Sequence, residues 1–134
     1  MTAAIALQKA LYQTLSGDAS LQGIMGAGKV FDEALPDTRP PYAVFSPATS
    51  SDWSTATEDG EEHGFTIEAW SSRKGRLEVM TIAAAVRDAV LSMGELEPPH
   101  HLVNIVHRTT IIARDDQSGY YRASMQFRAV TEPQ

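Results

Sequence analysis

The chain has 134 residues, of which 43% are hydrophobic and 21% charged, and it carries a formal net charge of −6 and no cysteine. This length predicts one domain over residues 1–134, with a core large enough to fold without disulfides or a structural metal. The absence of cysteine excludes a thiolate zinc site and a cysteine nucleophile. The negative charge argues against binding nucleic acid by neutralising phosphates, and no run approaches the ~18 apolar residues of a membrane span.

The N-terminal third of the sequence predicts helix and then loop. Apolar residues at helical spacing indicate a helix over residues 3–15, with Thr2 as its N-cap. A short helical turn over 18–24 and a brief extended segment over 29–32 are expected next. Prolines between residues 36 and 41 then mark a loop that cannot be helical.

The first of two predicted β-hairpins follows this loop. The composition of residues 42–46 predicts a strand, and its extension toward Ser50 requires Pro47 to lie at an edge or a bulge. Apolar and polar residues alternate over 62–71, which predicts the antiparallel partner strand. The polar stretch between the strands forms a long hairpin tip, with a turn signal at Asp59-Gly60.

A second helix and a second hairpin complete the chain. Apolar residues three and four apart predict a helix from Arg76 that stops by Gly94. Residues 102–113 are rich in Val, Ile and Thr, and residues 121–129 alternate strictly, so both are expected to be strands. The order α-β-β-α-β-β predicts an α+β fold, a four-stranded antiparallel sheet with helices packed on one face.

Three histidines, His100, His101 and His107, are candidates for a metal site. The first two are adjacent and point apart in most loop conformations, and the third lies within a strand, so their spacing favours structural or solvated histidines. The sequence holds no nucleophile motif and no phosphate loop, and we predict no catalytic residue, no cofactor and no metal ligand. The alternative left open is a small soluble ligand-binding domain or enzyme with a site near His100–His107.

Two surfaces are candidate interfaces. The hairpin tip over residues 52–62 holds five carboxylates and no Lys or Arg, and it includes a tryptophan, a residue common at interface anchors. An ordinary mobile loop is the alternative interpretation. The polar row from Arg122 to Arg128 forms either a solvated sheet face or, in an oligomer, a subunit contact. The candidate interface or lumen residues are Asp52, Trp53, Glu58, Asp59, Glu61, Glu62, Arg122 and Arg128.

Several short phrases occur together, in a fixed order, across residues 5–130. They are Leu-Gln-Lys-Ala-Leu-Tyr-Gln-Thr-Leu at 7–15, Lys-Val-Phe-Asp at 29–32, Pro-Tyr-Ala-Val-Phe at 41–45 and Ile-Glu-Ala-Trp-Ser at 67–71. Gly75 and a helix rich in Ala and Val come next. In this combination the chain resembles the small tail-terminator (tail completion) proteins of long-tailed phages and phage-like gene transfer agents.

The resemblance implies a structural protein of the virion tail, not an enzyme, which is assembled in the cytoplasm of a bacterial host. It implies a homo-oligomeric ring, hexameric in that family, at the head-proximal end of the tail tube. The ring would end polymerisation of the tube protein and offer the surface on which the head-side connector or stopper protein docks. A ring needs two different patches on each subunit, and edge strands are suited to supply them.

DNA would pass through the channel of such a ring without specific binding. Carboxylates facing the lumen repel phosphates, so a conduit of this charge does not retain its cargo. We therefore expect the hairpin over residues 52–62 to lie at a rim of the ring or in its channel.

Overall fold

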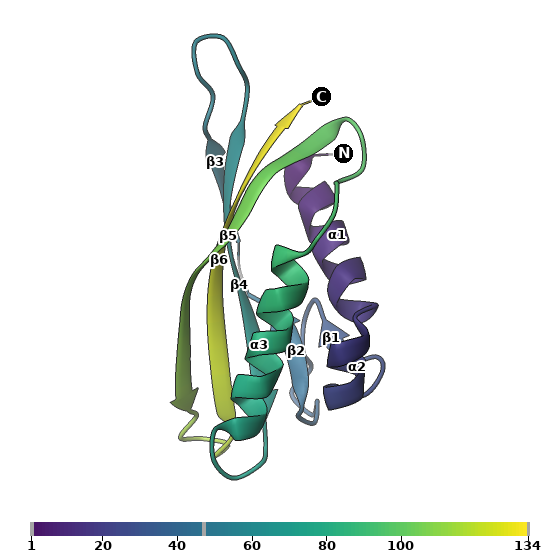
Figure 1. Cartoon of the computed structure of the whole chain (residues 1–134). Coiled ribbons are helices and arrows are strands. Elements are labelled where there is room, and N and C mark those ends of the chain that lie inside the picture. The colour runs from purple at the N-terminus through teal and green to yellow at the C-terminus, as the bar shows by residue number, and fades with distance from the viewer. Residues whose placement is uncertain (1, 47, 134) are drawn as a thin grey trace.

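The structure, a computed structural model, describes residues 2–46 and 48–133. The elements in chain order are α1 (Ala3–Ser16), α2 (Ala19–Met25), β1 (Val30–Phe31), β2 (Tyr42–Phe45), β3 (Thr49–Asp52), β4 (Glu61–Ser71), α3 (Leu77–Leu91), β5 (His100–Arg114) and β6 (Tyr121–Pro133). The helices all lie on one side of a tall sheet (Figure 1). None of the helices within the described ranges is long and apolar enough to cross a membrane.

Side-chain caps fix the two N-terminal helices. The Thr2 hydroxyl accepts a hydrogen bond from the backbone N–H of Ile5 at 3.2 Å, which begins α1 as the sequence predicts. Asp18 does the same for α2, accepting from the N–H of Leu21 at 3.0 Å. The expected helix over 3–15 and the short turn of helix after it are both confirmed.

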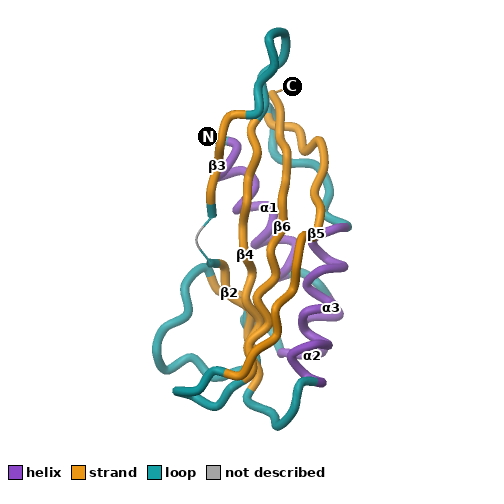
Figure 2. Tube along the Cα trace, turned by 90° about the vertical axis from the view of Figure 1, so that its left-hand side faces the viewer, coloured by secondary structure: helices purple, strands orange, loops and turns teal. Residues whose placement is uncertain are grey.

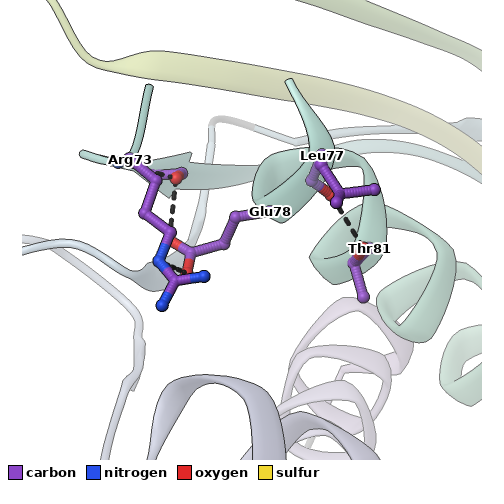
Figure 3. A network of polar contacts seen from close by, with 5 residues as sticks. Arg73, Leu77, Glu78 and Thr81 are labelled. Carbon is purple, nitrogen blue, oxygen red and sulfur yellow. Dashed lines mark hydrogen bonds and ion pairs between the residues drawn. The ribbon is translucent and has the colours of Figure 1, made fainter. Parts of the chain in front are cut away.

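A polar network organises the connection from β4 to α3. The Ser71 hydroxyl, which is fully buried, donates to the Glu78 carboxylate at 2.7 Å and accepts from the backbone N–H of Arg73 at 3.2 Å. The Arg73 guanidinium also approaches Glu78 at 3.3 Å, as Figure 3 shows. Gly75 supplies a φ of +83°, which only glycine adopts without strain. This tight turn directs α3 back over the sheet.

The sheet has β4 and β6 as its central pair of long strands. The strand order is β1-β2-β4-β6-β5, and β3 pairs with β4 beyond the end of β2 (Figure 2). β4 and β6 pair in register over their whole shared length, from Glu61 opposite Thr131 to Ser71 opposite Tyr121. The outer edge of β5 lies on one side of the molecule, and β1, β2 and β3 lie on the other.

The predicted fold class is correct at the level of α+β, but the strand count and order are wrong. The sheet has six strands instead of four, and one pair, β1 with β2, is parallel. The segment 29–32 is extended as expected, yet a strand of two residues carries too little periodicity to be recognised in a sequence. The proline-rich loop that follows β1 carries the chain back to the end of the sheet where β1 begins. The next strand, β2, therefore runs in the same direction, and Val30 and Phe31 pair in parallel with Ala43 and Val44.

The first arm of the predicted hairpin is interrupted. Phe45 lies opposite Ile67, while Thr49 lies opposite Gly64, so the first arm holds one residue more than its partner over this interval. An extra residue breaks a ladder into two strands, which is why β2 and β3 are separate. Pro47, where we expected an edge or a bulge, lies outside the described residues.

The core lies between the helices and the face of the sheet that they cover. The alternation predicted for the last strand is confirmed, because Ala123, Met125, Phe127 and Ala129 are buried on that face. The helices contribute apolar stripes at helical spacing. The buried helical residues include Leu7, Leu11 and Leu15 of α1 and Val79, Ile82, Val86 and Val90 of α3. The opposite face of the sheet carries no helix in the described part of the chain (Figures 1 and 2).

Candidate assembly interface

The β3–β4 hairpin projects past the ends of the other strands, at the end of the molecule where both chain termini lie (Figure 1). Its antiparallel pairing runs from Thr49 opposite Gly64 to Asp52 opposite Glu61, and the loop between the strands covers residues 53–60. The hairpin tip that the sequence predicts is therefore present. Its shape makes it accessible to another chain from both sides.

The turn of the hairpin lies at residues 55–58, a few residues before the Asp59-Gly60 pair that the sequence indicates. The backbone N–H of Trp53 donates to the carbonyl of Gly60 at 2.9 Å, so the ladder continues past Asp52. The N–H of Thr55 donates to the carbonyl of Glu58 at 2.7 Å, which closes the turn. The Asp59-Gly60 pair that signals a turn in the sequence lies on the returning arm, after the closing bond, and Gly60 packs there against Trp53.

Trp53 is half-exposed, at 50% of its surface, and its indole packs against the backbone of Gly60. A Cβ on Gly60 would lie 3.3 Å from the indole ring, closer than ordinary contact, and 3.4 Å from the carbonyl oxygen of Thr131, at the limit of ordinary contact. The tryptophan is thus held in place on one side and open on the other. That arrangement suits a residue that anchors a contact between chains.

Hydrogen bonds from Ser54 favour the charged form of the Asp52 carboxylate. Ser54 donates both its hydroxyl, at 2.6 Å, and its backbone N–H, at 3.1 Å, to the Asp52 carboxylate, and these bonds lower the pKa of Asp52. A hollow of about 230 Å³ at the hairpin's base is lined by Asp52, Asp59, Glu61 and Glu132, among others. This end of the molecule is consequently strongly negative.

His63 joins the hairpin to the rest of the sheet. The residue is 2% exposed, and its two ring nitrogens form hydrogen bonds of 2.9 Å with the hydroxyls of Ser50 on β3 and Thr131 on β6. Burial lowers the pKa of His63, although the nearby Glu61 carboxylate opposes this effect. The neutral imidazole is therefore the form that the fold prefers.

This preference predicts a pH dependence of stability. Because the pKa of His63 is lower in the folded chain than the ~6.5 of an unfolded one, the unfolded state takes up the proton first as pH falls. Stability should therefore decrease as pH drops through about 6.5 and below. We expect the loss of unfolding free energy between pH 7 and pH 5, measured by urea titration, to be smaller in His63→Gln than in the unmodified chain.

His101 provides a control of opposite sign. The Glu95 carboxylate bonds its ring at 2.9 Å and raises the pKa of His101, so its contribution to stability is present at low pH and lost as pH rises. The loss of unfolding free energy between pH 7 and pH 5 should therefore be larger in His101→Gln than in the unmodified chain. Identical pH dependence in His63→Gln and the unmodified chain would show that burial of the imidazole has no such effect.

The second candidate surface is the sheet face opposite the helices. The Arg128 guanidinium forms an ion pair with Glu62 at 2.9 Å, so two predicted interface residues contact each other. The guanidinium of Arg122 lies over the indole of Trp70, 5.5 Å from the ring centroid. The ring of Tyr42 also stacks with this indole, with the two ring centroids 6.3 Å apart. The face is thus an ordered polar and aromatic surface, in which Arg122 and Arg128 are both held by contacts.

The histidines considered for a metal site are placed separately. His101 bonds Glu95, His107 bonds the hydroxyl of Thr110 at 2.6 Å, and His100 lies at the hollow beside the hairpin. Across residues 2–46 and 48–133 no group of three His, Cys, Asp or Glu side chains is placed to hold a metal ion. Sequence reasoning missed a different feature, an open groove between α3 and β5, because its residues come from two elements that are adjacent only in the fold.

These features define a small α+β protein whose most prominent elements are a projecting acidic hairpin and a sheet with an uncovered face. The family model for tail completion protein gp17 matches residues 9–132, and the chain belongs to this family. It is a structural protein of a phage-type tail, not an enzyme, as the sequence predicts. The sequence-based resemblance is thereby confirmed.

A solved structure agrees with this assignment. A chain in the virion of a native gene transfer agent particle matches with 31% identity and a TM-score of 0.84, and the match covers 96% of both chains. No curated protein matches the chain. The likeness extends over nearly the whole of both chains, and it agrees with a structural role in a phage-type particle.

Proposed function

We propose that the protein forms a closed ring at the head-proximal end of the tail tube, where it ends tube polymerisation and provides the surface that joins the head. The projecting acidic hairpin is the observation that carries this proposal, since it makes one end of the subunit unlike the other. A terminator needs this asymmetry, because one rim must match the tube and the other must not continue it. The resemblance to tail-terminator proteins implies six copies in this ring.

The sheet supports ring closure through its edges. β5 at one edge and β1 with β2 at the other present different residues, as a heterologous contact requires. Identical contacts repeated around an axis close into a ring when the rotation between copies allows it. In that ring the partners along the axis are the tube protein on one side and the head-side connector or stopper on the other.

The charge of the hairpin fits a position at a rim or in the channel. Five carboxylates between Asp52 and Glu62, without a compensating Lys or Arg in that stretch, repel the phosphates of DNA that passes through. The protein on this account contacts DNA without holding it. The alternative of a ligand-binding domain or enzyme near His100–His107 has less support, since no group of three or more His, Asp or Glu side chains in residues 2–46 and 48–133 is placed to hold a metal ion.

Antibody labelling of intact particles tests the proposal. Gold-labelled antibody raised against this chain should decorate one position, the junction of head and tail, in electron micrographs. An antibody against the tube protein, which should label the whole tail, is the matched control. Label spread along the tail, or confined to its distal tip, would show that the protein does not terminate the tube at the head.

A further inference from the structure

An open groove of about 550 Å³ lies between helix α3 and the edge strand β5. Met80 and Ala84 of α3 and Ile112 of β5 give it an apolar surface, and Met80 is 51% exposed. Arg87 and Arg108 add two positive charges along it, and neither forms an ion pair within the described part of the chain. The groove therefore suits an apolar side chain with carboxylates on either side.

The edge strand is not suited to pair with an added strand at this point. The register of β5 against β6 shifts between His107 and Thr109, so Arg108 sits in a β-bulge without a partner on β6. A β-bulge interrupts the row of N–H and C=O groups that an added strand would pair with, and it changes the direction of the bulged residue's side chain. A loop that inserts a side chain fits the groove better than an extended strand does.

A loop of this description lies at the opposite edge of the same sheet. Residues 32–41 connect β1 to β2, and Leu35 is 66% exposed in the first part of this connection, residues 32–38. Glu33 and Asp37 flank it at two residues on either side, both exposed and both without an ion pair among the described residues. Leu35 and its two carboxylates complement the groove in polarity and in charge.

The loop is held at both ends. The side-chain amide of Gln8 donates to the Asp32 carboxylate at 2.8 Å, and the Lys29 ammonium donates to the carbonyl of Arg39 at 2.8 Å. Ordering a flexible segment costs free energy on binding, and a segment already fixed avoids most of that cost. Binding of this loop to another chain should therefore cost little conformational entropy.

Loop and groove also lie at the same level along the strands. The pairing runs straight across the sheet, from Val30 to Ala43, Ala69, Ala123 and finally Ile112 in the groove. When a copy is rotated about an axis parallel to the strands, its loop and its groove stay at the same height along that axis. Neighbouring copies in a ring built this way therefore present loop and groove to each other.

We propose that loop 32–38 of one copy docks in the α3–β5 groove of the next, and that this contact, repeated, closes the ring. Leu35 enters the apolar part of the groove, with Asp37 facing Arg108 and Glu33 facing Arg87. The inference rests on the proposed function, whose ring it supplies with an interface. It leaves the hairpin at one rim, because the hairpin projects along the strands.

Cross-linking in assembled particles tests the contact directly. The chain has no cysteine, so introduced thiols are the only ones it carries. Particles containing the double variant Leu35→Cys with Ala84→Cys, treated with a short bismaleimide, should yield a ladder of covalent multiples of the monomer. Each single variant should remain monomeric, since a heterologous contact brings position 35 of one copy only to position 84 of another.

The pair Leu35→Cys with Ile111→Cys is the matched control. Ile111 is 60% exposed but lies on the uncovered sheet face, so this pair should give no ladder. A ladder from the control pair and none from position 84 would overturn the inference, while antibody label at the head–tail junction would still support the proposed function. Label elsewhere on the particle would instead reject the proposed function itself.

A charge exchange gives a second readout. Arg108→Glu should abolish the position-specific ladder by placing like charges together, and Asp37→Arg in the same chain should restore it. Both positions are exposed, so neither change disturbs the core. Failure of Asp37→Arg to restore cross-linking would contradict the predicted pairing of these charges.

Discussion

Replacing residues 53–60 with a two-residue Asn-Gly turn should leave the fold intact and disrupt tails. Asp52 and Glu61 already pair across the strands, and a two-residue turn of this type closes such a ladder. Residues 53–59 are exposed, and the only buried residue removed is Gly60, whose contact is with Trp53 of the same segment and with Thr131, so we expect the fold to be retained with a small change in unfolding free energy. Particles made with this variant should show tails of aberrant length or tails without heads in electron micrographs.

A full-length variant separates the charge of the hairpin from its shape. Glu58→Gln with Asp59→Asn keeps the loop and removes two of its carboxylates. If the hairpin acts by reaching a neighbouring component, this variant should assemble normally; if it acts by repelling DNA, tails should form but DNA delivery should fall. Normal particles and normal delivery from the shortened hairpin would remove the hairpin from the mechanism.

Phe127→Ala should cost about 3–5 kcal/mol of unfolding free energy. Phe127 is 2% exposed, stacks on Phe65 at a centroid distance of 5.3 Å and meets the ring of His107 edge-on at 5.5 Å. Its removal leaves a cavity in the middle of the central strand pair. Since domains of this kind are stable by only about 5–15 kcal/mol, the loss is a large fraction of the total.

Urea unfolding of the purified variant measures this effect, and Ile111→Ala is the control. Ile111 lies on the uncovered face of the sheet, and its truncation should change stability by no more than about 0.5 kcal/mol. Particles from cells that produce only the Phe127→Ala chain should resemble particles that lack the protein. Equal destabilisation by both substitutions would mean that the buried stack is not a principal support of the core.

The sequence predicted the elements whose periodicity is long and regular. The α3 stripe and the alternation of β6 span enough residues for one face to be recognised, and both are confirmed. β1 was too short, and its parallel pairing depends on the path of the loop between residues 32 and 41, which local sequence does not specify. The division of the first hairpin arm into β2 and β3 depends on one extra residue, which periodicity alone does not reveal.

The candidate site was predictable only in part. Charge and a tryptophan within one segment identified the hairpin, because both are local properties of residues 52–62. The contact of Arg128 with Glu62 joins residues far apart in sequence and depends on the register of β4 with β6. The α3–β5 groove was missed for the same reason, since it exists only once the sheet is assembled.

The length of tails in particles that lack this protein tests the central proposal most directly. A strain deleted for the gene, complemented by the unmodified gene as control, should produce overlong tails that are not joined to filled heads. On the proposed function, tube polymerisation has no stop without the ring, and the head has no surface on which to dock. Tails of normal length attached to filled heads would contradict the account.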